Sequence, residues 1–304
     1  MKENFHQVSS YKVSSEYEGT RLDNCLISRL KGLPRAKIYS IIRKGEVRVN
    51  KSRCKPSQRL KVGDIIRIPP YTAKPKVNKK SSDLNKEKVE NSIIRKEKDF
   101  LILNKPVGLA CHGGSGISLG LIEIIRQLDK TYSDAQLVHR IDKDTSGCLV
   151  VALKKSILRE FHKEIRDKQV HKVYVAVVKG KWPKDLKKIM LSIKKQTSKT
   201  GERSVQVNEK GKLSETEFEL ISYGEANSLV RAKIITGRTH QIRVHSSHKG
   251  HPIVGDNKYG DPSYNKILQS KGLKRMLLHA ESINFFNLGI KQTASLPAVF
   301  KDYV

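Results

Sequence analysis

A run of six apolar residues at 148–153 constrains this chain more than any other segment, because it is too short for most helices and apolar enough for a buried strand. The turn before it crowds together a histidine, an arginine and two carboxylates, which are His139, Arg140, Asp142 and Asp144. Ionisable groups at the edge of a hydrophobic core are typical of a catalytic site. On spacing alone, an ion pair between an aspartate and Arg140 at the strand end explains the turn equally well.

The charge of the chain is the second constraint. Its 304 residues include 60 Lys and Arg against 30 Asp and Glu, a net charge of +30 at pH 7, and 37% of them are hydrophobic. A folded protein this basic attracts polyanions, so RNA or DNA is the expected partner. No stretch reaches the roughly 18 to 20 apolar residues that span a bilayer, and the N-terminus lacks the apolar segment of a signal peptide. We therefore expect a cytoplasmic protein with no membrane partner.

Cysteine and histidine spacing indicates no metal site. The cysteines are isolated from one another, with no pair at metal-ligand or disulfide spacing, and the histidines of 245–251 lie among cations that would repel a metal ion. The glycine-rich segment 112–116 matches neither the P-loop nor the dinucleotide-binding pattern. We expect a monomer that uses neither a metal nor a cofactor.

Residues 19–70 have the pattern of a compact unit. The spacing of leucines and isoleucines predicts two short helices, over 21–30 and 35–44. Alternating apolar residues after the second helix predict short strands, which end at the prolines 69–70. The unit is therefore expected to contain two helices and a few short strands.

Cationic side chains are concentrated on the second of these helices and on the loop after it. The residues expected to bind RNA there are Arg35, Lys37, Arg43, Lys44, Arg48 and Lys51. Backbone phosphates are the natural ligands of such a cluster. A merely solubilising lysine-rich surface and a DNA-reading helix-turn-helix are the alternatives.

A polar segment separates this unit from the rest of the chain. Residues 71–91 are mostly lysine, serine, asparagine and glutamate, and such a segment buries too little surface to offset its ordering entropy. We expect a flexible charged linker there. Strand and helix patterns then alternate over 92–304, including a helix over 239–249 capped by Thr236. This order predicts an α+β domain whose mixed sheet is mostly antiparallel.

Three segments of this second domain resemble the motifs of the RluA-type pseudouridine synthases. They are HRIDKDTSG at 139–147, KVYVA at 172–176 and TGRTHQIRVH at 236–245. The first unit is similar to the S4 RNA-binding domain in GTRLD at 19–23 and IRKGEVRVNK at 42–51. The resemblance extends from Gly19 to Ala280. It implies an S4 domain followed by a catalytic domain that isomerises uridine in RNA to pseudouridine.

The resemblance also implies catalytic roles, first of all for Asp142, the carboxylate without which the reaction cannot proceed. Burial favours the neutral form of a carboxyl group, so an arginine must keep it ionised, and an arginine can bind both of its oxygens. The family places the arginine of its third motif, here Arg243, beside this aspartate. Arg238 is the alternative partner if Arg243 instead binds a phosphate. Tyr174 matches the tyrosine that stacks on uracil, although an ordinary core tyrosine is the simpler interpretation of that strand alone.

Three further positions match the family. Arg140 is expected to fill the gap left by the extruded nucleotide, with pairing to Asp144 as the alternative. His139 and His279 are expected to be structural residues, hydrogen-bonded near the site. Segment 112–118 is most similar to the subfamily that modifies several uridines of 23S rRNA in the large ribosomal subunit.

The sequence therefore predicts an enzyme, an rRNA pseudouridine synthase whose partner is 23S rRNA or a large-subunit assembly intermediate. A non-catalytic rRNA-binding assembly factor is the alternative from another class, and a tRNA-acting member of the same family is the alternative within it. A binding protein explains the charge equally well. Only an enzyme explains Asp142, Tyr174 and Arg243 together.

Overall fold

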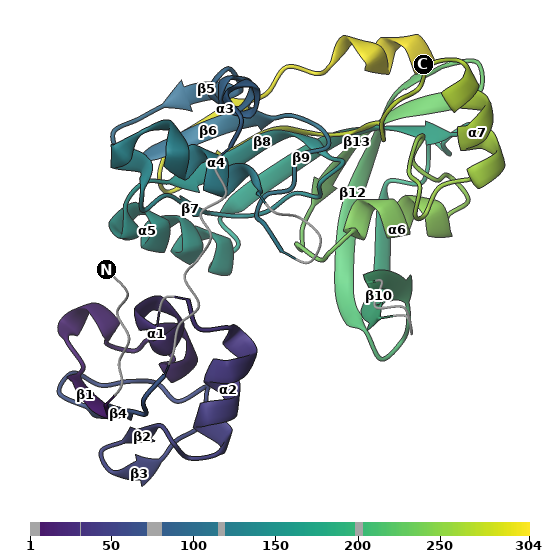
Figure 1. The fold of residues 1–304 in the computed structure, drawn as a ribbon. Helices are drawn as coiled ribbons and strands as arrows, with labels where there is room; N and C mark the ends of the chain where they lie inside the picture. The colour runs from purple at the N-terminus through teal and green to yellow at the C-terminus, as the bar shows by residue number, and fades with distance from the viewer. Residues whose placement is uncertain (1–6, 31, 72–80, 115–118, 198–202) are drawn as a thin grey trace. The chain divides into compact units, whose positions relative to one another are not determined.

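The computed structural model describes residues 7–30, 32–71, 81–114, 119–197 and 203–304. The chain divides into two compact units, Met1–Asn78 and Lys79–Val304, and each has its own core (Figure 1). None of the helices in the described ranges has the length and apolar character needed to cross a bilayer.

The N-terminal unit combines two helices with a small antiparallel sheet. Its elements are β1 (Ser9–Lys12), a 3-10 turn (Ser15–Tyr17), α1 (Leu22–Arg29), α2 (Arg35–Arg43), β2 (Arg48–Val49), β3 (Ser52–Arg53) and β4 (Ile65–Ile68). The sheet order is β1-β4-β2-β3. The expected helices and short strands are present. The unit also takes in β1, which precedes the expected boundary at residue 19, because this short strand pairs along the edge of β4.

A shared apolar core holds this unit together. Leu22 and Leu26 of α1 pack in one cluster with Ile38 and Ile42 of α2 and Ile66 of β4, and none of these side chains is more than 2% exposed. The four-residue spacing of the apolar residues therefore places them on the inner face of each helix.

A buried carboxylate links the two helices. Asp23 accepts hydrogen bonds from Arg21 Nε and Nη2 at 3.1 and 2.6 Å, from the Tyr39 hydroxyl at 2.8 Å and from the Asn24 amide at 2.8 Å. The hydrogen bonds from Arg21, supported by that from Tyr39, hold the pKa of Asp23 below its usual value against the effect of burial. The GTRLD segment thus has a structural explanation in the contacts of its own aspartate.

The C-terminal unit is built on one large sheet. Its 11 strands within the described residues have the order β11-β10-β12-β13-β9-β14-β8-β6-β5, with β15 on β14 and β7 on β8. The strands are β5 (Ile93–Lys96), β6 (Phe100–Lys105), β7 (Gln136–Leu137), β8 (Ser146–Ala152), β9 (Val170–Lys179), β10 (Lys188–Thr197), β11 (Arg203–Val207), β12 (Lys212–Tyr223), β13 (Asn227–Ile234), β14 (Leu278–Phe285) and β15 (Ile290–Thr293). Among the strands that the structure describes, only β14 and β8 pair in parallel. The expected α+β fold with a mostly antiparallel mixed sheet is confirmed.

Helices pack on this sheet. They are α3 (Asp83–Glu90), α4 (Leu121–Leu128), α5 (Lys155–Arg166), α6 (Gln241–His248) and α7 (Pro262–Ser270), with 3-10 turns at Lys130–Tyr132 and Ala298–Tyr303. Leu121 and Ile125 of α4 and Phe161 of α5 are fully buried in one cluster with Leu101 of β6 and Leu149 of β8. This cluster anchors β8, the strand that leads out of the 139–147 loop, and its neighbour β6.

The expectation of a flexible linker over 71–91 does not hold for its second half. Asp83–Glu90 form α3, and the hydroxyl of Ser82 caps its first turn. Val89 is 1% exposed and belongs to the main core cluster of the unit. A capped helix with one well-buried side chain can be ordered by a neighbouring helix despite a polar composition. Residues 72–80 lie outside the described residues.

Two close approaches of the backbone shape the site. Gly147, at the start of β8, has φ 110, and a Cβ there would lie 2.2 Å from the Ala280 carbonyl oxygen of β14. Helix α6 starts at Gln241, two residues later than expected, after His240 in a left-handed conformation. The expectation that Thr236 caps this helix is wrong. Its hydroxyl donates to the side-chain oxygen Oε1 of Gln241 at 2.8 Å and does not accept from a backbone amide of the first helical turn.

Candidate active site

The loop that carries Asp142 is anchored on both sides. The Cys111 thiol donates to the Ile141 carbonyl at 3.2 Å, and the Lys105 ammonium donates to the Lys143 carbonyl at 3.0 Å. Lys105 is fully buried, and burial lowers its pKa to about 8. Sequence reasoning did not find these anchors. The only signal for them is the Asn-Lys-Pro segment at 104–106, which ends the buried strand β6.

Asp142 lies where two cavities meet. One, of about 810 Å³, is lined by Arg140, Tyr174 and Arg243 together with Asp142. The other, of about 860 Å³, extends toward Asp256 and is also lined by Asp142 and Arg243. The residues singled out in the three sequence motifs therefore meet around a space large enough for a nucleotide.

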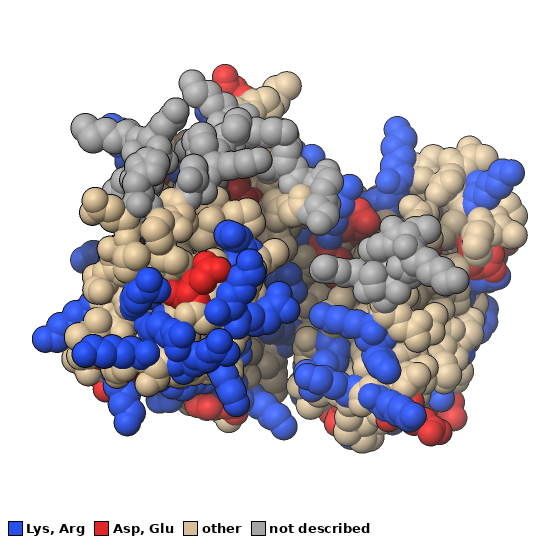
Figure 2. Space-filling model, turned by 60° about the horizontal axis from the view of Figure 1, so that its bottom comes forward, with Lys and Arg blue, Asp and Glu red and all other residues tan. Residues whose placement is uncertain are grey.

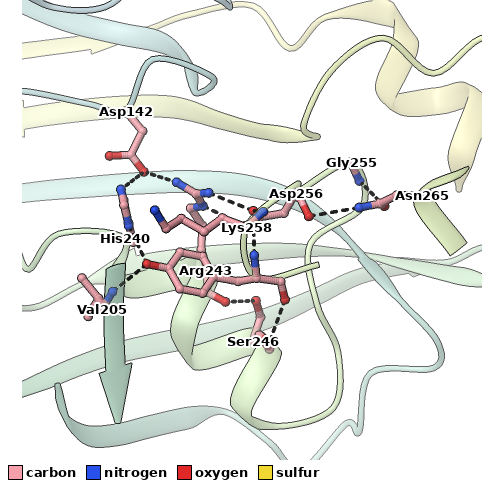
Figure 3. A network of polar contacts seen from close by, with 11 residues as sticks. Asp142, Val205, His240, Arg243, Ser246, Gly255, Asp256, Lys258 and Asn265 are labelled. Atoms are coloured by element: carbon pink, nitrogen blue, oxygen red, sulfur yellow. Dashed lines mark hydrogen bonds and ion pairs between the residues drawn. The ribbon is translucent and has the colours of Figure 1, made fainter. Parts of the chain in front are cut away.

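Arg243 is held between two carboxylates (Figure 3). Its Nη1 donates to Asp142 Oδ2 at 2.9 Å, while its Nε and Nη2 donate to the two oxygens of Asp256 at 2.7 and 2.8 Å. The expected pairing with Asp142 is present, but it uses one carboxylate oxygen rather than two. The guanidinium makes its bidentate pair of hydrogen bonds with Asp256 instead.

Asp256 is the site residue that sequence reasoning missed. It is 1% exposed and also accepts from the backbone amides of Lys258 and Tyr259 at 2.8 and 3.1 Å. Burial alone would raise the pKa of Asp256, but the hydrogen bonds and charge of Arg243 outweigh burial and hold it below its usual value. The one sequence signal is the preceding Gly255, whose φ of 75 and close packing permit no side chain.

The same contacts fix the charge of Arg243. Its side chain is 8% exposed, and burial alone would lower its pKa. Hydrogen bonding and charge from Asp256, followed by the charge of Asp142, raise the pKa of Arg243 instead. The cation beside Asp142 is thus permanent and fixed in orientation.

His240 approaches the same carboxylate from the other side. Its Nε2 lies 3.7 Å from Asp142 Oδ2, and its Nδ1 lies 2.7 Å from the Tyr259 hydroxyl. Burial lowers the pKa of His240 although the charge of Asp142 opposes this, so the ring is neutral at pH 7. The backbone of His240 has φ 55, a conformation that costs energy for a residue other than glycine. Such strain is common at functional sites.

Tyr174 lies on β9 with its ring at the cavity wall. It is 9% exposed, and its cross-strand neighbours are Ala232 of β13 and Ala280 of β14. Both neighbours are small, and the part of Tyr174 that remains exposed lines the 810 Å³ cavity. Burial and then the charge of Asp142 raise the pKa of Tyr174, so the phenol keeps its proton.

The two other arginines of the motifs do not contact Asp142. Arg140 is exposed and donates from Nη1 to His112 Nε2 at 2.9 Å, so its partner is not Asp144. Arg238 is also exposed, and its Nε donates to the Leu213 carbonyl at 3.4 Å. The alternative in which Arg238 pairs with Asp142 is therefore not what the structure shows.

Both predicted framework histidines are hydrogen-bonded. His139 Nε2 accepts from the Val150 amide at 3.2 Å, and burial holds the pKa of His139 well below its usual value. His279 is fully buried, with Nδ1 2.8 Å from Ser146 Oγ and Nε2 3.3 Å from the Ala294 carbonyl. Burial lowers the pKa of His279 to about 4. Neither ring carries charge at neutral pH.

The basic cluster of the N-terminal unit lies on its surface. Five of its six cations are exposed and Arg48 is partly buried, and none forms an ion pair with a carboxylate of the described residues. Figure 2 shows a face of the molecule on which Lys and Arg far outnumber Asp and Glu. Within the described ranges, no three His, Cys, Asp or Glu side chains gather as metal ligands.

Comparison with protein families agrees with this fold and site. The family described as RNA pseudouridylate synthase matches residues 99–248, and the S4 domain matches residues 20–66. The chain therefore belongs to the RNA pseudouridylate synthase family and carries an N-terminal S4 domain.

Its relatives narrow the class. The chain is 47% identical over 280 residues to ribosomal large subunit pseudouridine synthase C of Haemophilus influenzae, covering 91% of this chain and 87% of that protein. It is 42% identical over 302 residues to the protein of the same name from Escherichia coli strain K12, covering 98% and 95%. Human RNA pseudouridylate synthase domain containing 1 is 27% identical, with a TM-score of 0.57 over 71% of this chain and 86% of that one. Human RNA pseudouridylate synthase domain containing 4, at 24% identity and a TM-score of 0.58 over 72% and 93%, shares the fold.

Proposed function

We propose that this chain isomerises several uridines of 23S rRNA to pseudouridine, on free rRNA or on a large-subunit assembly intermediate. The observation that carries the proposal is the meeting of Asp142, Arg243 and Tyr174 around one cavity. The names of its relatives, which refer to the large ribosomal subunit, support the choice of RNA. We further propose that the protein acts in the cytoplasm as a monomer and that its reaction uses neither a metal nor a cofactor.

The chemistry demands a carboxylate with a free oxygen. Isomerisation breaks the C1′–N1 bond, turns the base in place and joins C1′ to C5. Asp142 either adds to C1′ or removes the 2′ proton, and both routes use the same ionised group. Oδ2 is held by Arg243, which leaves Oδ1 available to the substrate because no described residue donates to it.

The neighbouring groups hold the nucleotide. Tyr174, which lines the cavity, offers the aromatic side chain against which the uracil stacks before and after it turns. Arg140, exposed at the rim of the cavity, takes the space that the extruded nucleotide leaves in the RNA stack. The exposed cations of α2 and the following hairpin bind the phosphates of neighbouring rRNA.

A tritium-release assay tests the proposal, because the hydrogen on C5 of uridine is lost only when C5 joins the sugar. Wild-type protein should release tritium from a 23S rRNA transcript labelled at C5, and Asp142→Asn should not. Binding of the transcript without release by the wild-type protein would favour the assembly factor. Release from a tRNA transcript but not from rRNA would favour the tRNA-acting alternative.

A further inference from the structure

Lys172 stands beside Tyr174 on the wall of the cavity that holds Asp142. The two residues lie two positions apart on β9, and side chains at that spacing point to the same face of a sheet. Lys172 is partly buried and lines the 810 Å³ cavity. Its ammonium group is therefore close to the place where a base stacked on Tyr174 would lie.

The ammonium group of Lys172 has no carboxylate partner among the described residues. Its cross-strand neighbours are Ile234 of β13 and Ile283 of β14. Within the described residues it forms no hydrogen bond and no ion pair, with Asp142 or with any other carboxylate. Burial lowers the pKa of Lys172 to about 8. An unpaired, partly desolvated ammonium reduces stability, and such a cost is commonly found where a charge serves a ligand.

The reaction creates a charge that this ammonium could balance. When the C1′–N1 bond breaks, its electron pair stays with the base, and the negative charge spreads over N1 and the carbonyl oxygens O2 and O4. When C1′ joins C5, the detached base supplies the electron pair of the new carbon–carbon bond. The C5 proton then leaves to water and N1 takes up a proton from water, so the product is an isomer of the starting nucleotide. A fixed donor at a carbonyl oxygen stabilises the charged state more than the neutral nucleotide.

We propose that Lys172 is a further catalytic residue, whose ammonium donates a hydrogen bond to a uracil carbonyl oxygen and stabilises the detached base. The proposal rests on the proposed function and adds a leaving-group partner to Asp142. Lys172 keeps its proton throughout, so the step needs no additional acid, base or co-reactant. Its role complements that of Tyr174, which holds the face of the base while Lys172 holds its edge.

Deprotonation of the Lys172 ammonium group should lower the rate of the reaction. The active form is protonated and its pKa is about 8, so kcat/KM should fall as the pH rises above that value. Tyr174 lies on the same strand, and the other ionisable side chains that line the cavity are Cys111, His112, His139, Arg140, Asp142, Lys143, Lys195, Arg238, His240 and Arg243. Burial lowers the pKa of His139 and His240 and raises the pKa of Cys111 and Tyr174, so none of these four titrates near pH 8. The anchor Lys105 has a similar pKa, so the assignment needs a variant of Lys172 itself.

The test compares Lys172→Met and Lys172→Arg with a control, Lys195→Met, in the full-length protein. Lys195 lines the same cavity but is exposed on β10. With enzyme in excess over a 23S rRNA transcript that the wild type modifies, the single-turnover rate of Lys172→Met should fall about 10²-fold, with little change in RNA affinity. Lys172→Arg should recover much of the rate and lose the decline above pH 8. Lys195→Met should weaken RNA binding and keep the decline of the rate above pH 8.

Two further readouts separate chemistry from structure. With 5-fluorouridine at the target, C5 carries no hydrogen to lose, so the readout is the disappearance of intact 5-fluorouridine from a nuclease digest of the RNA. The detached 5-fluorouracil is the more stable anion, so the rate deficit of Lys172→Met should shrink markedly. The melting temperature of Lys172→Met should rise, because a methionine suits the two isoleucines better than an unpaired charge. A wild-type single-turnover rate in Lys172→Met would overturn the proposal. A loss seen only in affinity, like that of Lys195→Met, would make Lys172 a phosphate contact and would also overturn it.

Discussion

Asp23 in the S4 domain and Asp142 in the catalytic domain are both carboxylates held by an arginine, but their remaining contacts differ. The Asp23 side chain is 2% exposed, and its oxygens accept from Arg21, from Tyr39 and from a backbone amide. The Asp142 side chain is 28% exposed, and Arg243 binds only its Oδ2. Both oxygens of Asp23 accept hydrogen bonds from the protein, so this carboxylate stabilises the fold. Only one oxygen of Asp142 accepts a hydrogen bond from the described residues, so the other is available to react.

The two arginines that bind these carboxylates, Arg21 and Arg243, also differ in their exposure and in their other contacts. Arg21 is 42% exposed and serves one carboxylate. Arg243 is 8% exposed and is gripped by Asp256, so that only one nitrogen is left for Asp142. In the catalytic domain, Asp256 therefore fixes the orientation of Arg243, and Arg243 in turn fixes the orientation of Asp142.

The largest effect is expected from Asp142→Asn. The amide keeps the shape of the side chain but cannot act as a nucleophile or base, so the single-turnover rate should fall by about four orders of magnitude or more. Affinity for rRNA should be largely kept, since the basic surfaces are unchanged. A residual rate close to wild type would break the distinction between the two aspartates.

Arg243→Met should have the next largest effect. Removing one partner from a buried pair costs about 3–5 kcal/mol, which corresponds to about two to four orders of magnitude in rate. The single-turnover rate measures this loss, with Arg238→Met as the control that should keep its rate. Survival of activity with weaker RNA binding would make Arg243 a phosphate contact.

Asp23→Asn should give the opposite phenotype. It removes the charge that Arg21 and Tyr39 bind, so the melting temperature of the S4 domain should fall by a few degrees. Because Asp23 has no substrate to meet, the single-turnover rate of folded protein should not change. Calorimetry and the rate assay on one preparation separate the two outcomes, and an unchanged melting temperature would contradict the structural role given to Asp23.

The smallest expected effect comes from a single surface cation. Arg43→Gln on α2 should reduce the slope of log K against log salt by about 0.7 to 0.9, the contribution of one phosphate contact, and leave catalysis intact. Lys12→Gln on β1, also exposed but outside the cluster, is the matched control and should leave the slope unchanged. Equal slopes for both variants would show that the cluster only keeps the protein soluble.

Sequence patterns predicted the contacts that depend on recurring motifs, including the pairing of Asp142 with Arg243. They did not predict Asp256, because it lies outside the motifs and joins the site only through the turn at Gly255. They also failed for α3, whose order depends on one buried valine and a neighbouring helix, and for the turn at Thr236. For Asp256 and α3 the missing information was a contact between separate segments. For Thr236 it was the direction of a side-chain hydrogen bond to Gln241, five residues along the chain. Composition and periodicity contain neither.

The most direct measurement is a map of pseudouridines in 23S rRNA from cells that lack this gene. The account predicts that several sites disappear, that the wild-type gene restores them, and that a gene carrying Asp142→Asn does not, although the variant protein still accumulates and binds rRNA. A map that is unchanged by loss of the gene, or that is restored by the Asp142→Asn protein, would contradict it.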